Sequence, residues 1–293
     1  MTFRSGFCCF VGRPNAGKST LTNALVGAKI VITSDKPQTT RHAVRGILTR
    51  DDAQLVLVDT PGLHRPRTLL GERLNDVVRA TLGEVDVVGF CVPADQRIGP
   101  GDRFIAGELA ELKAPVIGIV TKTDAVSRQR VAEQLIALSE LGEFADIVPV
   151  SAVAGDQVEL LADLLVGYLP EGPQLYPGDV TTDNDVETRI AELVREAALD
   201  GVRDELPHSI AVTIDEMRRR DSGLQEIFAT VHLERDSQKG IVIGPQGSRL
   251  MRIGTTARAG IEALLGERVH LALHVAVERD WQRDPKKLDR LGF

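Results

Sequence analysis

Short aliphatic runs alternate with longer amphipathic stretches from residue 7 to residue 168. The stretches between the runs have helical periodicity, as in KSTLTNALVG (18–27) and RQRVAEQLIALSEL (128–141). Continuous aliphatic runs are typical of strands buried on both faces, and their alternation with helices predicts an α/β domain with a mostly parallel central sheet. The predicted strands are FCCFV (7–11), LVLVD (55–59), VVGFCV (87–92), VIGIVT (116–121) and DIVPVS (146–151).

A different pattern follows residue 169. Residues 170–184 hold three prolines and several turn formers, which indicates a linker. Beyond it the order of predicted elements is α-β-β-α-β, which is typical of a smaller α+β unit. We therefore expect a first domain over 1–169, a linker over 170–184 and a second domain over 185–293. The predicted elements of the second domain are a helix over 185–202, strands over 210–218 and 227–234, a loop and helix over 244–265, and a strand over 268–278.

Composition agrees with this division. The 293 residues suffice for two domains, and with 43% hydrophobic but only 4% aromatic residues the cores must be aliphatic. A net charge of −7 argues against binding to nucleic acid by bulk electrostatics alone. No apolar run is long enough to span a membrane, so we expect no transmembrane segment. The cysteines lie in apolar stretches, which indicates buried thiols in a reducing, cytoplasmic compartment; they are Cys8, Cys9 and Cys91.

The segment GRPNAGKS (12–19) fits the phosphate-binding pattern G-x-x-x-x-G-K-[ST] between a predicted strand and a predicted helix. Gly12 and Gly17 let backbone amides turn toward phosphates, and Lys18 brings a positive charge to the β- and γ-phosphates. The hydroxyl of Ser19 is a candidate Mg²⁺ ligand. The other loop residues expected to contact a nucleotide are Arg13, Pro14, Asn15, Ala16 and Thr20.

Two further segments fit the same chemistry. In LVLVDTPG, Asp59 ends an apolar strand where it can hold Mg²⁺ through a water, and Gly62 can offer its N–H to a γ-phosphate. PQTTRH (37–42) precedes that strand, where a mobile loop could cover the nucleotide. A threonine hydroxyl there would complete the Mg²⁺ shell, and we favour Thr40 over Thr39.

Base recognition is predicted from TKTD (121–124) and SAV (151–153), each at the end of a predicted strand. Asp124 can accept hydrogen bonds from guanine N1–H and N2–H₂, a donor pair that adenine lacks. The stem of Lys122 can lie over the base, and the Ala152 N–H can meet guanine O6. Each string alone is weak evidence, but four such elements in this order predict a guanine-nucleotide site at the carboxyl edge of the sheet. Thr121, Ser151 and Val153 complete the predicted contacts.

GRPNAGKS, TTRH, DTPG, TKTD and SAV resemble the motifs of the translation-factor-related P-loop GTPases, and nearly the whole chain is similar to the bacterial Era family. The resemblance implies a GTPase domain followed by a type II KH domain, and slow Mg²⁺-dependent hydrolysis of GTP to GDP. It also implies binding to small-subunit ribosomal RNA, a role in small-subunit assembly and, for some members, loose attachment to the inner membrane face. Thr121 departs from the family's Asn-Lys-x-Asp motif, so we expect weaker base affinity, with Asp124 keeping the main discriminating contact.

No glutamine follows Gly62 to orient the attacking water, as it does in many GTPases. Leu63 occupies that position and cannot orient water, and His64 is either a solvated loop residue or a substitute. We expect backbone groups around Thr40 and Gly62 to hold the water, with Mg²⁺ and Lys18 neutralising charge. By resemblance, Asn15 either holds a K⁺ ion or only shapes the loop, and both interpretations stay open.

A second glycine loop lies in IVIGPQGSRL (241–250), and three interpretations compete. The first is a second nucleotide-binding loop, but the Lys-Ser pair that such a loop requires does not follow it. The second is a plain turn between two helices, which binds no ligand. A KH-type GxxG loop clamps about four single-stranded nucleotides. Residues 186–293 hold 17 basic and 18 acidic residues, yet residues 235–258 hold five basic residues against one acidic, which favours the KH loop. The predicted RNA contacts are Lys239, Ile243, Gly244, Pro245, Gln246, Gly247, Ser248, Arg249 and Arg252.

The inner pair of this loop, Pro245 and Gln246, carries no charge, whereas Era-like loops often have a basic residue there. We expect a weaker clamp, with flanking cations supplying the electrostatic attraction. The apolar residues Ile241, Ile243 and Ile253 are candidates for a base-binding surface or for the core.

A rival function is a membrane-surface signalling GTPase whose C-terminal domain binds protein or lipid. The basic tail residues Lys286, Lys287 and Arg290 are compatible with it, but the tail is short and has no lipidation motif. An RNA-modifying enzyme would need a catalytic constellation that the sequence lacks outside the GTPase motifs.

Overall fold

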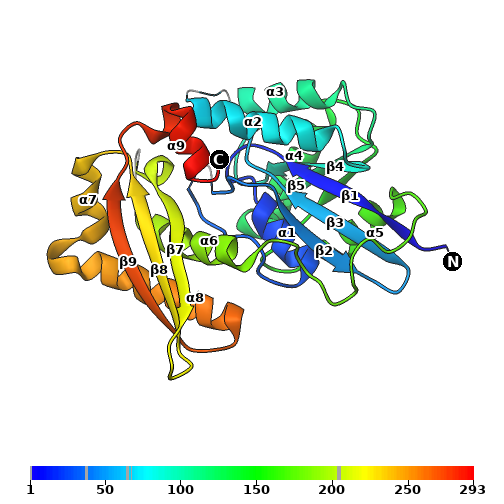
Figure 1. The fold of residues 1–293 in the computed structure, drawn as a ribbon. Coiled ribbons are helices and arrows are strands. Elements are labelled where there is room, and N and C mark those ends of the chain that lie inside the picture. Colours follow the sequence, from blue (N-terminus) through cyan, green and yellow to red (C-terminus); the bar gives the residue numbers. More distant parts are fainter. Residues whose placement is uncertain (1, 37–38, 64–65, 67, 203–205) are drawn as a thin grey trace. The chain divides into compact units, whose positions relative to one another are not determined.

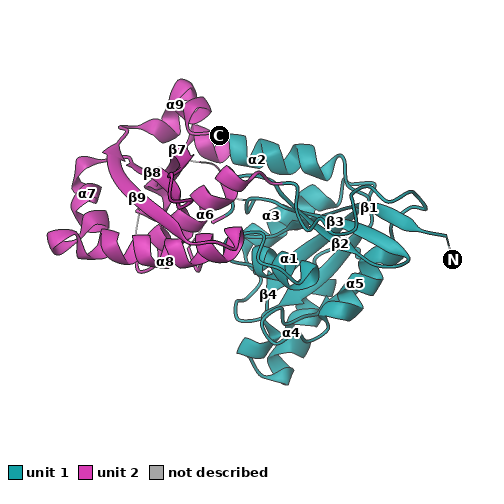
Figure 2. Ribbon diagram, turned by 60° about the horizontal axis from the view of Figure 1, so that its bottom comes forward, with its two compact units in different colours: residues 1–33, 40–65, 73–183 teal, residues 34–39, 66–72, 184–293 magenta. Residues whose placement is uncertain are grey.

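The computed structural model describes residues 2–36, 39–63, 66, 68–202 and 206–293. It divides into two compact units (Figure 2). Unit 1 comprises residues 1–33, 40–65 and 73–183, and unit 2 comprises residues 34–39, 66–72 and 184–293. Two short segments from the first half of the chain thus belong to unit 2.

Unit 1 is built on a six-stranded sheet in the order β2-β3-β1-β4-β5-β6, in which only the β2–β3 pair is antiparallel. Four of the five predicted runs lie in β1, β3, β4 and β5, which are almost wholly buried, and the fifth lies in β6. Figure 1 shows helices on both faces of this sheet. The strands are β1 (Arg4–Val11), β2 (Val44–Thr49), β3 (Ala53–Asp59), β4 (Val87–Pro93), β5 (Val116–Thr121) and β6 (Asp146–Pro149).

Neighbouring residues of one strand serve opposite cores, as the alternation of side chains in a strand requires. Cys8 and Phe10 pack into a core with residues of α1 and α5, whereas Cys9 and Val11 pack into a core with residues of α2, α3 and α4. This two-sided burial explains why the strands are continuous apolar runs. The helices are α1 (Lys18–Val26), α2 (Leu69–Leu82), α3 (Pro100–Leu109), α4 (Arg128–Ser139) and α5 (Val158–Gly167).

The segment predicted as a linker is ordered along unit 1. Glu171 and Thr182 form isolated bridges with Arg4 and Gly46. The buried side chain of Gln54 accepts hydrogen bonds from the backbone amides of residues 175 and 176, at 2.7 and 2.8 Å. The predicted linker is rich in turn-forming residues, yet specific polar contacts hold it in place on unit 1.

Unit 2 has a three-stranded sheet, β7-β8-β9, with an antiparallel first pair and a parallel second pair. The apolar faces of α6 and α8 form one core with the sheet (Figure 1). Two helices separate β8 from β9, where the sequence pattern predicts one. Its elements are α6 (Val186–Leu199), β7 (Ala211–Arg219), β8 (Gln225–Leu233), α7 (Asp236–Ile243), α8 (Ser248–Leu265), β9 (Val269–Val277) and α9 (Pro285–Arg290).

Within the described ranges, no helix combines the length and apolar character needed to cross a bilayer. The three cysteines are free and buried, as the sequence predicts.

Candidate functional site

The first glycine loop connects β1 to α1, and its backbone requires its glycines. Gly17, which precedes α1, has φ of 87°, in the left-handed region that favours glycine. A Cβ atom on Gly12 would lie 2.5 Å from the carbonyl oxygen of Cys91. Lys18 is buried, and its Nζ donates to the carbonyls of Gly12 and Arg13 at 3.2 Å each. The loop therefore places its ammonium group at the N-terminus of a helix, the arrangement that binds phosphates.

Burial dominates the electrostatics of Lys18 and Asp59. Desolvation lowers the pKa of Lys18, and the nearby Asp59 charge opposes that shift. Desolvation likewise raises the pKa of Asp59, which the Lys18 charge and two hydroxyl donors oppose. Two opposite charges are thus kept in a water-poor site, where a bound polyphosphate and divalent cation would interact strongly with them.

The three predicted Mg²⁺ ligands meet in one cluster. The hydroxyls of Ser19 and Thr40 both donate to Asp59 Oδ2, at 2.8 and 2.9 Å, and lie 2.9 Å from each other. Asp59 is fully buried, and its Oδ1 has no hydrogen-bond partner among the described residues. Hydroxyl and carboxylate oxygens are the ligands that Mg²⁺ prefers, and the unpartnered buried oxygen fits a cation with its water shell. The hydroxyl of Thr39, in contrast, donates to the carbonyl of Lys36 at 2.7 Å.

Gly62 lies directly against the phosphate loop. A Cβ atom there would be 2.8 Å from the backbone nitrogen of Pro14 and 3.1 Å from its Cα. Only glycine permits this approach without displacing the loop, so the backbone of residue 62 is positioned beside the phosphate site. The next residue, Leu63, is buried. His64, the alternative water-orienting candidate, lies outside the described residues.

Residues from all the predicted base-recognition segments line a cavity of about 170 Å³. Among the lining residues, the buried Thr121 donates a 2.7 Å hydrogen bond from its hydroxyl to the carbonyl of Ala16 in the glycine loop. The threonine at the position of the family's asparagine therefore ties the base-recognition segment to the phosphate loop. The lining residues are Gly17, Thr20, Leu21, Thr121, Lys122, Asp124, Ala125, Val150, Ala152 and Val153.

Three polar contacts hold the base-recognition segments in place. The buried Ser151 hydroxyl donates to Asp124 Oδ1 at 2.5 Å, and it accepts from the Ala154 amide at 3.0 Å. The Lys122 ammonium lies 3.5 Å from Asp95, which follows β4. Asp124 itself is exposed.

One pair at the site has no signal in the local sequence. The Arg13 Nε donates to Asp102 at 2.7 Å, and Asp102 is fully buried and also accepts from the Gly99 amide at 2.8 Å. This pair joins the glycine loop to the start of α3. Separation by 89 residues hides it from motif analysis. Asn15, the K⁺ candidate, has a left-handed backbone with φ of 63° at the turn of the same loop.

The second glycine loop joins α7 to α8 in unit 2. Gly244, Gln246 and Gly247 all have positive φ, at 71°, 50° and 79°. A Cβ atom on Gly244 would lie 2.7 Å from the Cβ of Arg249, whereas a Cβ atom on Gly247 would meet nothing within 4 Å. Gly247 therefore presents bare backbone to open space at the N-terminus of α8, where a phosphodiester can approach.

The residues flanking this loop divide between binding surface and core. Lys239 and Arg252 are exposed, and so are Pro245, Gln246 and Ser248. Arg249 turns inward instead: its guanidinium donates to the carbonyls of Ala198 and Asp200 at the C-terminal end of α6, at 3.4 and 2.8 Å.

The apolar side chains near the loop divide in the same way. Ile253 is buried in the core of unit 2, and Ile243 is only partly buried. Ile241 is 52% exposed, and Met251, which the sequence pattern did not single out, is 72% exposed. A shallow apolar surface beside the loop can therefore come from Ile241 and Met251 but not from Ile253.

These features define a class of protein: a P-loop GTPase domain followed by a KH-type unit. Family models agree, because a "50S ribosome-binding GTPase" model matches residues 7–122 and a KH domain model matches residues 205–282.

The chain is 64% identical to GTPase Era from a Nocardioides species, over 99% of this chain and 96% of that protein. It is also 64% identical to GTPase Era from Streptomyces coelicolor, over 99% and 95%. The chain therefore belongs to the Era family of GTPases, and the resemblance inferred from its motifs is confirmed.

Two solved structures of Era resemble the whole fold. One is Era in complex with MgGDPNP and nucleotides 1506–1542 of 16S ribosomal RNA, and the other is an Aquifex aeolicus Era variant bound to GDP·AlF₄⁻. Each has a TM-score of 0.95 and 36% identity, and each match covers 99% of both chains. The predicted fold class, a mostly parallel α/β domain followed by a KH domain, is confirmed.

Proposed function

We propose that this protein is a Mg²⁺-dependent GTPase that binds single-stranded small-subunit ribosomal RNA through its KH unit and assists small-subunit assembly. The observation that carries the proposal is the convergence of the glycine loop, the Ser19–Thr40–Asp59 cluster and the base-recognition segments at one sheet edge. The Era relatives and the Era complex with 16S ribosomal RNA support the same function.

In the proposed reaction, a water attacks the γ-phosphorus of GTP and the bond to the β–γ bridging oxygen breaks, which yields GDP and phosphate. Lys18 and the amides of the glycine loop hold the phosphates, and the Gly62 N–H contacts the γ-phosphate. Ser19, Thr40 and Asp59 would hold Mg²⁺, which neutralises charge that develops on the phosphate oxygens. Backbone groups around Thr40 and Gly62 orient the water, since Leu63 has no polar group for that role.

For the base, we propose that Asp124 accepts hydrogen bonds from guanine N1–H and N2–H₂ and that the Ala152 N–H contacts O6. The stem of Lys122 lies over the ring. Ser151 keeps the Asp124 carboxylate in position through its 2.5 Å hydrogen bond.

For RNA, we propose that the backbone of residues 244–247 clamps phosphates and that Lys239 and Arg252 supply the nearby positive charge. The inward contacts of Arg249 limit it to a supporting role. Domain limits at 1–169 and 185–293, with 170–184 between them, remain our functional division of the chain.

We propose the cytoplasm as the location, because nucleotide and ribosomal RNA are found there and the three thiols are buried and free. Loose membrane attachment has less support, since Glu278 pairs with two of the three tail cations, Lys287 and Arg290. Flotation of the protein with anionic vesicles would reveal such attachment.

Titration of purified protein with GTP, GDP and ATP tests the nucleotide assignment. GTP and GDP should bind much more tightly than ATP, and Lys18→Ala should abolish turnover. Comparable ATP affinity would refute the guanine assignment. Crosslinking to RNA in the GTP and GDP states, followed by sequencing, tests the RNA assignment independently.

A further inference from the structure

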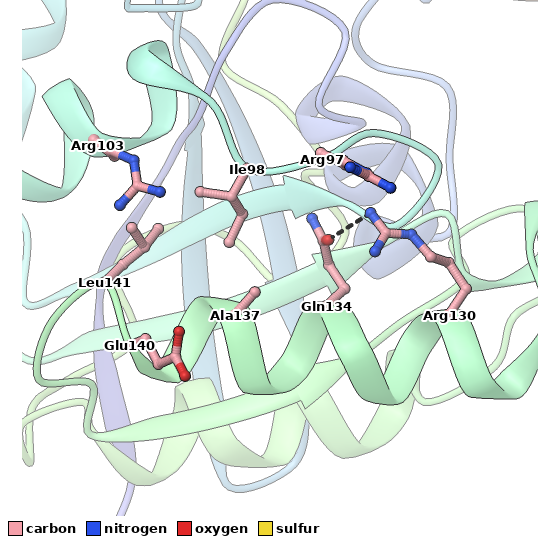
Figure 3. Close-up of a pocket in the computed structure, with 8 residues that line it drawn as sticks. All are labelled: Arg97, Ile98, Arg103, Arg130, Gln134, Ala137, Glu140 and Leu141. Atoms are coloured by element: carbon pink, nitrogen blue, oxygen red, sulfur yellow. Dashed lines mark hydrogen bonds between the residues drawn. The ribbon is translucent and has the colours of Figure 1, made fainter.

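Unit 1 has a second cavity, of about 300 Å³, formed by α4 and the segment before and at the start of α3 (Figure 3). Its volume is at the lower limit of small-molecule sites, which are roughly 300–1,000 Å³. None of its lining residues belongs to the nucleotide motifs. They are Arg97, Ile98, Arg103, Arg130, Gln134, Ala137, Glu140 and Leu141.

The α4 side of this cavity is built by helical spacing. Arg130, Gln134, Ala137 and Leu141 recur at intervals of three or four residues, so they share one face of the helix and its end. Gln134 is 1% exposed, and its amide donates to the carbonyls of Pro93 and Gln96 at 3.1 and 3.0 Å. These bonds fix the loop after β4 against α4.

The same glutamine orients a cation. Gln134 Oε1 accepts a 3.0 Å hydrogen bond from Arg130, which also donates to the Gln96 carbonyl at 3.3 Å. One guanidinium of the cavity is therefore held by a buried side chain before any ligand arrives. Pre-positioning of this kind lowers the ordering cost of binding.

The cavity has an excess of positive charge. Three arginines face one carboxylate, Glu140. Within the described part of the chain, the side chains of Arg97 and Arg103 make neither an ion pair nor a hydrogen bond. In Figure 3, Arg97 and Arg130 lie toward one end, and Arg103 and Glu140 lie toward the other. At the first end, Arg130 is partly neutralised by Glu133, whose carboxylate lies 3.5 Å from its guanidinium, so Arg97 supplies the uncompensated positive charge there, and the second end is balanced.

Between the two ends lie the apolar side chains of Ile98 and Ala137, and Leu141 lies between Arg103 and Glu140 at the second end (Figure 3). We propose that this cavity binds a small phosphate monoester, with the phosphate between Arg97 and Arg130 and an apolar body on the central strip. Guanidinium groups match phosphate oxygens in geometry and charge. A single cavity of this size does not track an extended strand, so the RNA backbone is not the proposed ligand.

Phenyl phosphate is the probe, added to full-length protein saturated with Mg²⁺ and GDP so that the glycine loop is already filled. Calorimetry should give saturable one-to-one binding, tighter than that of inorganic phosphate because the apolar strip contributes. The methyl carbon signal of Ala137 should shift with the same saturation curve.

Removing a positive or a negative charge from the cavity should change the affinity for phenyl phosphate in opposite directions. Arg97→Ala removes an exposed cation and should weaken binding by about tenfold or more, the effect of losing a charge-assisted hydrogen bond. Glu140→Gln removes the one carboxylate among the described lining residues and should tighten binding. Arg128→Ala, on the same helix but outside the lining, is the matched control and should leave the affinity unchanged.

Three results would overturn the proposal: no saturation by phenyl phosphate, saturation without a shift of the Ala137 methyl, or equal affinity in Arg97→Ala and the unsubstituted protein. Folding of each variant is checked by its urea unfolding curve. None of these outcomes bears on the GTPase assignment, because GDP stays bound throughout.

Discussion

The side-chain hydroxyl of Thr121 donates a 2.7 Å hydrogen bond to the backbone carbonyl of Ala16. Both residues are buried, and the bond links the base-recognition segment to the phosphate loop across 105 residues. Threonine thereby makes a contact to the glycine loop from the position where the family usually has asparagine. The expected loss of base affinity is therefore smaller than the shorter side chain alone would suggest.

Thr121→Val should weaken GDP binding and lower the free energy of unfolding by about 1–3 kcal/mol, because it leaves the Ala16 carbonyl unpaired in the interior. Thr121→Ser keeps the hydroxyl and should retain most of both quantities. Fluorescent-GDP titration and urea unfolding measure them. Equal losses in the two variants would show that the methyl packing, and not the hydrogen bond, is what matters.

Gly62→Ala should leave GDP binding nearly intact but slow GTP hydrolysis by about 10²-fold, since the added Cβ pushes against the Pro14 backbone and misplaces one transition-state donor. The control is Gly142→Ala, whose Cβ would meet nothing within 4 Å. Single-turnover phosphate release gives the rates. Unchanged hydrolysis in Gly62→Ala would remove residue 62 from the proposed mechanism.

The K⁺ interpretation of Asn15 predicts faster hydrolysis in KCl than in NaCl at equal ionic strength. Asn15→Gly tolerates the left-handed backbone at this position and should abolish the difference between the salts. If the unsubstituted protein hydrolyses GTP at the same rate in both salts, Asn15 only shapes the loop.

Glu226 on β8 predicts an acid-sensitive step in the stability of unit 2. Arg220, with Arg218, lowers the pKa of the Glu226 carboxyl to about 2, from an ordinary value of 4.5. A lowered native pKa adds stability that is present above pH 4.5 and is lost as the pH falls toward 2. Urea unfolding across this pH range should show that the free energy of unfolding falls less for Glu226→Gln than for the unsubstituted protein. Parallel declines would mean that other carboxylates cause the acid sensitivity.

Local strings of residues predicted which segments come together at the carboxyl edge of the sheet. The strands that are buried on both faces had an unmistakable pattern, and the motifs at their ends met because parallel strands align their carboxyl ends. β2 was not predicted: Arg45 is exposed and Leu48 only partly buried, so this edge strand has no continuous apolar run. α7 was not predicted either, because DSQKGIVI contains a glycine and ends in apolar residues that also suit a strand.

Long-range polar contacts were beyond sequence analysis. Arg13 and Asp102 are 89 residues apart, and no sequence motif that contains one of them predicts a contact with the other. Arg249 counted as one of the loop's cations in the sequence, yet its side chain donates to carbonyls at the C-terminal end of α6. The direction of a long side chain depends on neighbours that only the fold supplies.

We propose that one chain carries two separable sites, a GTPase centre and a glycine loop that binds RNA. Gly247→Asp tests it most directly, because the carboxylate would project into the open space where the phosphodiester is expected. Gly266→Asp is the matched control: Gly266 follows the same helix, has φ of 70° and also has nothing within 4 Å of an added Cβ.

The measurement is RNA affinity and GTP turnover of both variants, side by side, with an oligonucleotide of the 3′ end of small-subunit ribosomal RNA. We predict that Gly247→Asp weakens RNA binding by at least about tenfold through charge repulsion, while GTP turnover without RNA stays unchanged. Gly266→Asp should retain both activities. Undiminished RNA affinity in Gly247→Asp would contradict the account.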